Sequence, residues 1–376
     1  MFNVGIVCEY NPLHLGHIEQ LRTIDNLLGK ENNTKIALMS GNYVQRGEPA
    51  VVSKSVRAHA ALLSGVDLVL EYPFPYSCAP AKNFADNAVA LFDRLGVVDY
   101  LCFGSESADT ELLTKSSKIL ASDEFERNLS DAVKNNAEKK NYATLRAETF
   151  EKMSNIELLS TPNDILALEY LAAVEKRKSA IKPLVISRVG NFSAGAARKL
   201  MQNGKNLDNC LPQTMISAMQ GVNRVTLDDF SKTLIPYFRL ADPDELSNYA
   251  EMSFDLACRI TNASKKSHTL TELVENAASK SYTNARIRRA LLLSYFKVTS
   301  ERLNSEPNTV RLLAANDRGK SLLREISKKN GEIVVSSARP KTVNSESNDF
   351  SLTADSIYAL VSDIKTDFYR EKPFLR

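Results

Sequence analysis

The chain of 376 residues has no tryptophan and few cysteines. The cysteines are Cys8, Cys78, Cys102, Cys210 and Cys258. They are odd in number, stand far apart and form no Cys-x-x-Cys pair, which excludes the usual ligand spacing of a zinc site. Cys8 and Cys102 lie inside apolar runs typical of strands, so we interpret them as buried thiols of a reduced, cytoplasmic protein.

Long apolar runs and a strong charge excess are also missing. No stretch is long enough to span a bilayer, and Met1-Phe2-Asn3 leads straight into a predicted strand without a signal peptide. We therefore expect no membrane partner. The 48 basic and 45 acidic side chains give a net charge of +3, which permits a polyanionic partner without requiring one.

The first half of the chain alternates short apolar runs with amphipathic segments. The predicted strands are Asn3–Cys8, Lys35–Ser40, Val66–Glu71, Asp99–Phe103 and Leu184–Ser187. The predicted helices between them are Ile18–Leu28, Ser53–Ser64 and Ala79–Leu95. Apolar strands that alternate with helices indicate a parallel sheet covered on both faces. The sequence thus predicts a Rossmann-like α/β fold, in which ligands bind beyond the carboxyl ends of the strands.

Two regions are predicted. Residues 1–204 form the Rossmann-like domain, with a polar helical insertion at about 107–155, and residues 205–376 form a mostly helical C-terminal domain. In the second region we expect no strand before the short run Glu332–Val335, and we expect a surface loop over Ser336–Asp349.

The candidate catalytic residues are His14 and His17, which follow the first strand and open a helix. Three positions apart at a helix start, they face the same side, and Gly16 between them lets a ligand approach closely. Two imidazoles beside free backbone N–H groups can stabilise charge that develops on a phosphate. The alternative is a pair of surface or capping histidines. The chain has only four histidines, so the pairing does not follow from abundance.

The string GIVCEYNPLHLGH resembles the signature of the HIGH nucleotidyltransferase superfamily. Together with MSGNYVQRGEPAVVSKSVRAHAALLSGVDLVLEYP, it is similar to the tRNA(Met) cytidine acetate ligase family. The resemblance continues in Phe103-Gly104-Ser105-Glu106, Pro162-Asn163-Asp164-Ile165-Leu166, Ile186-Ser187-Arg188 and Tyr282-Thr283-Asn284-Ala285-Arg286-Ile287-Arg288-Arg289. It therefore covers most of the chain, with the longest and most specific motifs near the N-terminus.

The resemblance implies a ligase that forms acetyl-adenylate from ATP and acetate and transfers the acetyl group to N4 of the wobble cytidine of elongator tRNA(Met). It implies ATP as the co-substrate, with Mg²⁺. The loop that would hold ATP comprises Val7, Cys8, Glu9, Tyr10, Asn11, Pro12, Leu13, His14, Leu15, Gly16, His17 and Gln20. Gly104, Asn163 and Arg188 match further nucleotide-binding positions, although a turn glycine, a helix cap and a surface ion pair are their plain alternatives.

Other polar residues near the same sheet edge are weaker candidates. Arg46 and Lys54 could receive pyrophosphate or a tRNA phosphate, and Glu9 and Glu71 could carry Mg²⁺, though their spacing requires no metal. The superfamily's Ser/Thr-rich triphosphate segment is replaced by Phe192–Lys199, where Ser193 and Arg198 are plausible equivalents after a shortened loop.

A basic segment in the second region is the candidate tRNA-binding surface. Its candidate residues are Lys280, Arg286, Arg288 and Arg289, with Tyr282 among them. Cations interleaved with an aromatic ring suit an RNA backbone, while a solvated helix face is the alternative. A basic helix with Lys320, Arg324, Lys328 and Lys329 could extend this surface.

Two other functions remain open at this point. The first is a small-molecule nucleotidyltransferase that transfers AMP or CMP to a phosphorylated metabolite. The second is a nucleotide- or tRNA-binding module without turnover. The long second region with its basic residues favours an RNA partner, whereas the altered segment around Ser193 is the only support for lost turnover.

Overall fold

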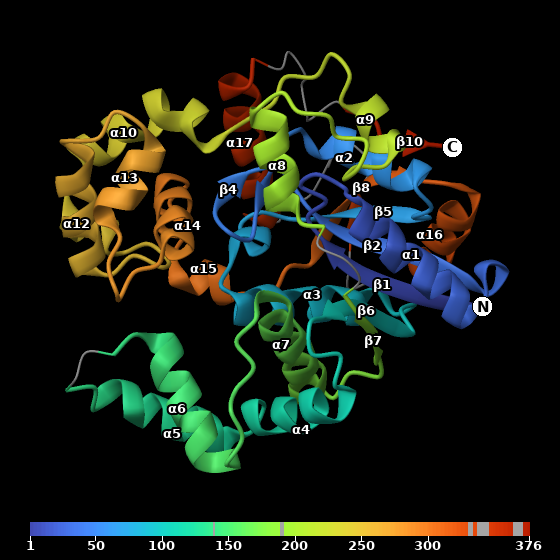
Figure 1. Cartoon of the computed structure of the whole chain (residues 1–376), viewed down its shortest axis with the longest axis horizontal. Helices are drawn as coiled ribbons and strands as arrows, with labels where there is room; N and C mark the ends of the chain where they lie inside the picture. The colour runs from blue at the N-terminus through green and yellow to red at the C-terminus, as the bar shows by residue number, and fades with distance from the viewer. Residues whose placement is uncertain (138–139, 189–191, 330–333, 337–345, 364–370) are drawn as a thin grey trace.

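The computed structural model describes residues 1–376 except 138–139, 189–191, 330–333, 337–345 and 364–370 (Figure 1). One sheet dominates the described chain, with the strand order β10-β8-β5-β2-β1-β6-β7 and with β9 paired to β8. Its strands are β1 Phe2–Cys8, β2 Asn33–Ser40, β5 Leu68–Tyr72, β6 Tyr100–Ser105, β7 Lys182–Ser187, β8 Thr309–Ala315, β9 Val334–Ser336 and β10 Phe374–Leu375. A separate hairpin pairs β3 Tyr43–Val44 with β4 Glu48–Pro49.

Helices surround this sheet. In the first half they are α1 Leu15–Leu28, α2 Lys54–Leu63, α3 Ala81–Leu95, α4 Thr110–Leu120, α5 Asp123–Lys134, α6 Tyr142–Ser154, α7 Pro162–Arg177 and α8 Ala194–Gln202. The remainder are α9 Gln213–Ala218, α10 Ser231–Leu240, α11 Pro243–Leu246, α12 Phe254–Ser264, α13 Leu270–Ala277, α14 Asn284–Tyr295, α15 Ser300–Asn304, α16 Asp317–Lys329 and α17 Glu346–Val361. No described helix has the length and apolar character that crossing a bilayer requires.

The centre of the sheet is parallel and buried on both faces. Strands β1, β2, β5, β6 and β7 pair in parallel, and every residue of β2 is buried. Because successive side chains of a strand point to opposite faces, Ile36 and Leu38 pack in one hydrophobic cluster while Ala37 and Met39 pack in the other. The first cluster is shared with α3 and α7, and the second with α1 and α2. The Rossmann-like prediction is confirmed.

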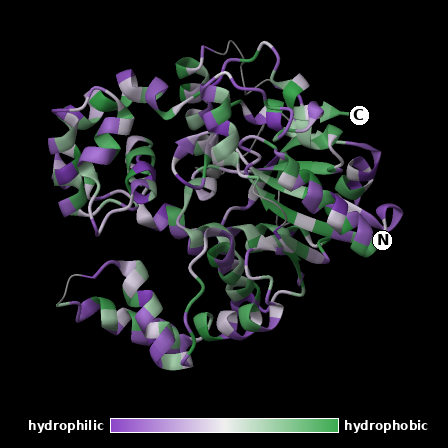
Figure 2. Cartoon of the chain, in the orientation of Figure 1, coloured by the Kyte–Doolittle hydropathy of each residue, from purple (hydrophilic) through white to green (hydrophobic). Residues whose placement is uncertain are grey.

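The colouring by hydropathy follows this arrangement. Figure 2 shows apolar residues along the strands of the sheet and alternating polar and apolar residues along the helices around it. The predicted helical insertion is present as α4, α5 and α6, and its helix α4 packs against α7. The insertion thus attaches to the helix that follows it in the chain.

The expectation that no strand returns before residue 332 is wrong. Thr309–Ala315 forms β8, which joins the sheet antiparallel to β5 with Leu68 opposite Ala315. Its sequence TVRLLAA is a short apolar run, and such a run does not distinguish a buried strand from a buried helix. The predicted run Glu332–Val335 lies partly outside the described residues, and so does the predicted loop Ser336–Asp349, whose last residues belong to α17.

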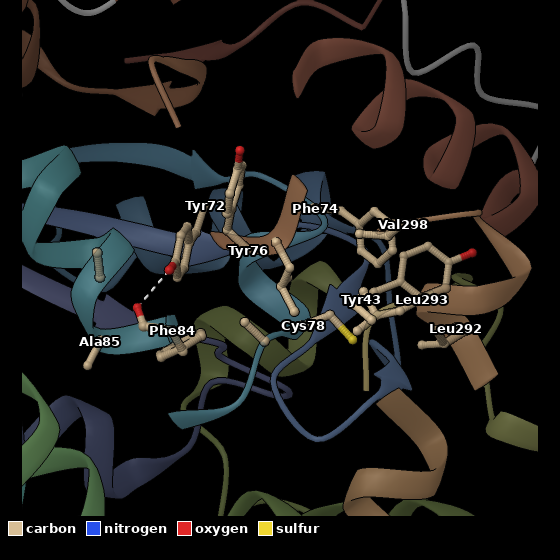
Figure 3. Packing of buried hydrophobic residues seen from close by; sticks show 14 of the residues in the cluster. Tyr43, Tyr72, Phe74, Tyr76, Cys78, Phe84, Ala85, Leu292, Leu293 and Val298 are labelled. Carbon is tan, nitrogen blue, oxygen red and sulfur yellow. Dashed lines mark hydrogen bonds between the residues drawn. The ribbon is translucent and has the colours of Figure 1, made fainter. Parts of the chain in front are cut away.

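The helical region from α9 to α15 shares a core with the sheet. Tyr43 and Phe74, from the Rossmann-like region, lie close to Leu292, Leu293 and Val298 in the packing shown in Figure 3. Aromatic contacts reinforce the junction, because the ring centroids of Phe74 and Phe296 are 5.1 Å apart. The two regions predicted from the sequence therefore share one hydrophobic cluster.

A buried ion cluster fastens the C-terminal helix α17 to the first half of the chain. Lys54 Nζ lies 2.7 Å from both carboxylate oxygens of Glu71 and also contacts Asp355 of α17. The three side chains are at most 4% exposed. Asn42 joins the cluster by donating to Asp355 over 2.8 Å and accepting from the Lys54 backbone over 2.7 Å.

Replacing Lys54 should therefore cost much of the protein's stability. In Lys54→Met, Glu71 and Asp355 face each other in the interior without their cation, and we expect the free energy of unfolding to fall by about 3–5 kcal/mol. Urea unfolding measures this loss. Lys82→Met is the matched control, because Lys82 is 59% exposed in its pair with Glu126 and should change stability by no more than about 0.5 kcal/mol. Equal losses in both variants would contradict the prediction.

Candidate nucleotide-binding site

The paired histidines cap the first helix with their own rings. His14 is the N-cap residue of α1, and its Nδ1 accepts the backbone N–H of Gly16 over 3.1 Å. His17 Nδ1 accepts the backbone N–H of His14 over 3.1 Å, so the two side chains cap the helix start reciprocally. The rings stack with centroids 3.7 Å apart. The two histidines therefore do cap the helix, as the alternative proposed. The capping uses only Nδ1 of each ring and does not involve Nε2.

That capping decides which nitrogen of each ring carries the proton. Because Nδ1 of His14 and of His17 accepts a hydrogen bond, the hydrogen-bond network assigns the proton of each neutral ring to Nε2. Burial, together with the smaller effect of the Arg188 guanidinium, lowers the pKa of His14 to about 4. Burial, then His14 and Arg188, holds the pKa of His17 well below its usual value. At neutral pH the site presents two uncharged Nε2–H donors.

The backbone approaches closely around Gly16. A Cβ at this position would lie 3.0 Å from the ring of His14 and 3.4 Å from Cβ of Phe192. Phe192 directly precedes Ser193, the N-cap of α8, whose side chain accepts the N–H of Ala196 over 3.1 Å. The start of α8 is thereby brought next to the start of α1. Part of the loop that the sequence suggests is shortened, residues 189–191, lies outside the described residues.

Glu106 gathers the predicted nucleotide-binding residues at the ends of β6 and β7. Its carboxylate accepts from Asn163 Nδ2 over 2.6 Å and from Arg188 Nη1 over 3.3 Å. The backbone N–H of Asp164 donates to the same carboxylate over 3.0 Å. Gly104, on the same strand end, has nothing within 4 Å of the place that a Cβ would occupy. Gly104, Asn163 and Arg188 therefore lie around one open strand end, and Arg188 is within electrostatic reach of both histidines.

Two carboxylates of this site received no role from the sequence. Besides Glu106, the buried Asp164 accepts from Ser105 Oγ over 2.5 Å and from Thr161 Oγ1 over 2.7 Å. Burial alone would raise the pKa of Asp164, but these hydrogen bonds lower it overall. Both residues lie inside the motifs Phe103–Glu106 and Pro162–Leu166, so these motifs were the sequence signal that could have identified them. The contact between the two motifs could not be read from the sequence.

Several residues of the predicted ATP loop serve the core. Cys8, Tyr10 and Leu13 are buried in the cluster beneath α1, so a ligand could reach them only through backbone atoms. Burial raises the pKa of Cys8 far above the range of a reactive thiol. Gln20 is engaged with Cys102, its Nε2 lying 3.7 Å from the sulfur. The loop therefore offers a ligand mainly its backbone and its two histidines.

The weaker candidates beside the loop are corrected by the structure. Lys54 and Glu71 neutralise each other in the buried ion cluster, so neither is available to a phosphate or to Mg²⁺. Glu9 accepts the backbone N–H of Gln45 over 3.0 Å, and burial raises its pKa. In the described part of the chain, no group of three or more His, Cys, Asp or Glu side chains could hold a metal ion. Arg46 remains exposed.

The basic segment lies at the start of α14 and is less free than the sequence suggests. Arg288 is 17% exposed and pairs with Glu48, while Arg289 is 12% exposed and pairs with Glu251. The guanidinium of Arg286 stands 5.0 Å from the ring centroid of Tyr282. Lys280 is exposed. The predicted face thus contains two arginines paired within the chain, one arginine beside the ring of Tyr282, and one exposed lysine.

The chain is similar to known proteins over nearly its whole length. The model of the HIGH Nucleotidyl Transferase family matches residues 1–372. A protein of Thermoanaerobacter sp. (strain X514) called tRNA(Met) cytidine acetate ligase is 36% identical, covering 95% of this chain and 94% of the relative. A protein of the same name from Acetivibrio thermocellus is 33% identical, covering 87% and 86%. The crystal structure of Thermotoga maritima TmcAL bound with alpha-thio ATP superimposes with a TM-score of 0.90 at 29% identity, covering 100% and 99%.

The protonation of the paired histidines can be tested directly. We expect ring ¹⁵N signals of His14 and His17 typical of neutral, Nε2-protonated imidazoles from pH 8 down to about 5, because the pKa of His14 is about 4. Below pH ~6.5 the two imidazoles bind protons in the unfolded chain but stay neutral in the folded protein. The free energy of unfolding should therefore also fall as the pH drops from about 6.5 towards 4. NMR titration of the labelled protein measures both rings. Titration near pH 6.5, or protonation at Nδ1, would contradict the assignment.

Proposed function

The chain belongs to the HIGH nucleotidyl transferase family, and from this premise we propose that it is a tRNA(Met) cytidine acetate ligase. Acetate is activated with ATP as acetyl-adenylate, and the acetyl group passes to N4 of the wobble cytidine of elongator tRNA(Met). The observation that carries the proposal is the pair of Nε2–H donors at the start of α1, in a chain that matches ligases of this name over nearly its whole length.

The first step suits these donors. The acetate carboxylate attacks the α-phosphorus of ATP, the bond to the bridging oxygen breaks and pyrophosphate leaves. Negative charge grows on the phosphate oxygens in the transition state, where preorganised donors stabilise it most. His14 and His17 donate without changing their protonation state, because their low pKa values keep both rings neutral. Activation is needed because a free carboxylate is a poor acyl donor, whereas AMP leaves readily.

The residues at the ends of β6 and β7 would hold the rest of the nucleotide. Gly104 leaves room for a base or ribose against the backbone, and Asn163 and Arg188 supply donors. Glu106 positions both side chains by accepting a hydrogen bond from each. We propose that Mg²⁺ accompanies the triphosphate of ATP, since such ions are held largely by substrate phosphates and water.

The second step requires tRNA close to this site. The cytidine N4 attacks the acetyl carbonyl, AMP leaves, and the amine loses a proton. We propose that Lys280, Arg286, Arg288 and Arg289 bind the tRNA backbone, with Lys280 as the most exposed of the four. We further propose that the protein works in the cytoplasm, where its tRNA substrate resides.

Acetate dependence separates this function from its alternatives. We expect the purified protein to form AMP and pyrophosphate from ATP only when acetate is present. His14→Asn keeps a good helix cap but lacks the Nε2–H donor, so its turnover should fall about 10²–10³-fold. Chromatography of labelled nucleotides measures AMP.

His268→Ala is the control, because His268 is exposed and outside the site. Acetate-independent AMP transfer would favour a small-molecule nucleotidyltransferase, and ATP binding without turnover would favour a binding module. A His14→Asn variant with wild-type turnover would remove His14 from the mechanism.

Salt dependence tests the tRNA surface. Each of Lys280→Ala and Arg286→Ala should weaken tRNA binding and reduce the slope of log K against log salt by about 1, because each removes one phosphate contact. Fluorescence titration over a range of salt concentrations measures the slope. Lys30→Ala removes a charge from the opposite end of β2, at the amino edge of the sheet, and should leave the slope unchanged. Unchanged slopes in the first two variants would leave those side chains structural.

A further inference from the structure

The β3–β4 hairpin, residues 43–49, lies between the nucleotide-binding loop and helix α14. On the loop side, the backbone N–H of Gln45 donates to Glu9 over 3.0 Å. On the helix side, Arg288 Nε donates to the carbonyl oxygen of Arg46 over 3.1 Å. The hairpin therefore contacts both the loop that would bind ATP and the helix that would bind tRNA.

The contact between hairpin and helix is tight. Gly47 has a φ of +74°, and a Cβ at this position would lie 2.4 Å from the backbone nitrogen of Arg289. No side chain fits at that distance, so α14 sits directly on the backbone of the hairpin turn. A shift of α14 must therefore move the hairpin or open this contact.

The carboxylate of Glu48 links helix α14 to the nucleotide-binding loop. Its Oε1 lies 3.2 Å from Arg288 Nη2, and its Oε2 lies 3.4 Å from Arg198 Nη2. Arg198 in turn donates from Nη1 to the carbonyl oxygen of Asn11, in the nucleotide-binding loop, over 2.8 Å. Side chains in this series are only 17–27% exposed, so solvent screens them less than a surface pair.

We propose that Glu48 is a positioning residue that couples tRNA binding at α14 to ATP binding at the loop. This inference rests on the proposed function. Glu48 divides its charge between Arg288 and Arg198. A tRNA phosphate that binds Arg288 draws this cation away, and the charge of Glu48 then acts on Arg198 alone. Arg198 is held more firmly on the Asn11 carbonyl, which orders the loop for ATP.

Coupling of this kind is reciprocal, so it can be measured from the ATP side. The probe is α,β-methylene ATP, which cannot release pyrophosphate, with acetate omitted and with tRNA(Met) absent or at a concentration that saturates each variant. In the wild type we expect tRNA to tighten analogue binding at least about fivefold. In Glu48→Gln, which keeps the shape but not the charge, we expect the ratio to fall to about 1.

Two further variants separate coupling from a general structural effect. Glu251→Gln removes the carboxylate that pairs with Arg289 on the same helix and does not touch Glu48, so it should keep the wild-type ratio. In Arg288→Gln the tightening of analogue binding by tRNA should disappear, as it does in Glu48→Gln. The double variant should show no further change, because both side chains act through one network.

The result is decisive in either direction. A wild-type ratio near one, a ratio retained in Glu48→Gln, or an equal loss in Glu251→Gln overturns the proposal. Thermal unfolding confirms that each variant is folded. The proposed function is tested separately by acetate-dependent AMP formation in the wild type, so failure of the coupling and failure of the ligase activity give different results.

Discussion

The reciprocal capping of helix α1 is the interaction on which the site depends. The first N–H groups of a helix have no partner within it and must find one elsewhere. Here the rings of His14 and His17 provide acceptors for the Gly16 and His14 N–H groups. Satisfying the helix start in this way fixes the Nε2 tautomer in both rings, so one set of hydrogen bonds both stabilises the fold and directs the donors.

The backbone that leads to this cap is held from behind by a buried cation. Arg57, fully buried on α2, donates from Nη1 to the carbonyl oxygens of Glu9 over 2.6 Å and Ser40 over 3.0 Å. It thereby joins the ends of β1 and β2 beneath the loop. Burial lowers the pKa of Arg57, yet its donors are satisfied by main-chain carbonyls. The adjacent ion cluster of Lys54, with Asp355 from α17, makes the C-terminal helix part of the same support.

Local sequence signals predicted most of the parallel sheet. The runs at Lys35–Ser40 and Leu184–Ser187 are strands, and the helix predicted over Ala79–Leu95 is present as α3. These signals are short-range, since apolar periodicity and helix caps involve residues that are close together in the chain. The strand β8 was not predicted because its place beside β5 is set by a pairing across 247 residues, from Leu68 to Ala315.

The sequence by itself determined the alternation of strands and helices, the two histidines at a helix start and the motifs that mark the family. Tertiary structure alone decided which charges remain free. Lys54 and Arg288 are both cations in the sequence, yet one is enclosed by Glu71 and Asp355 and the other is paired with Glu48. The physical reason is that a charge acts on whatever the fold brings within a few ångströms, and those partners lie far away along the chain.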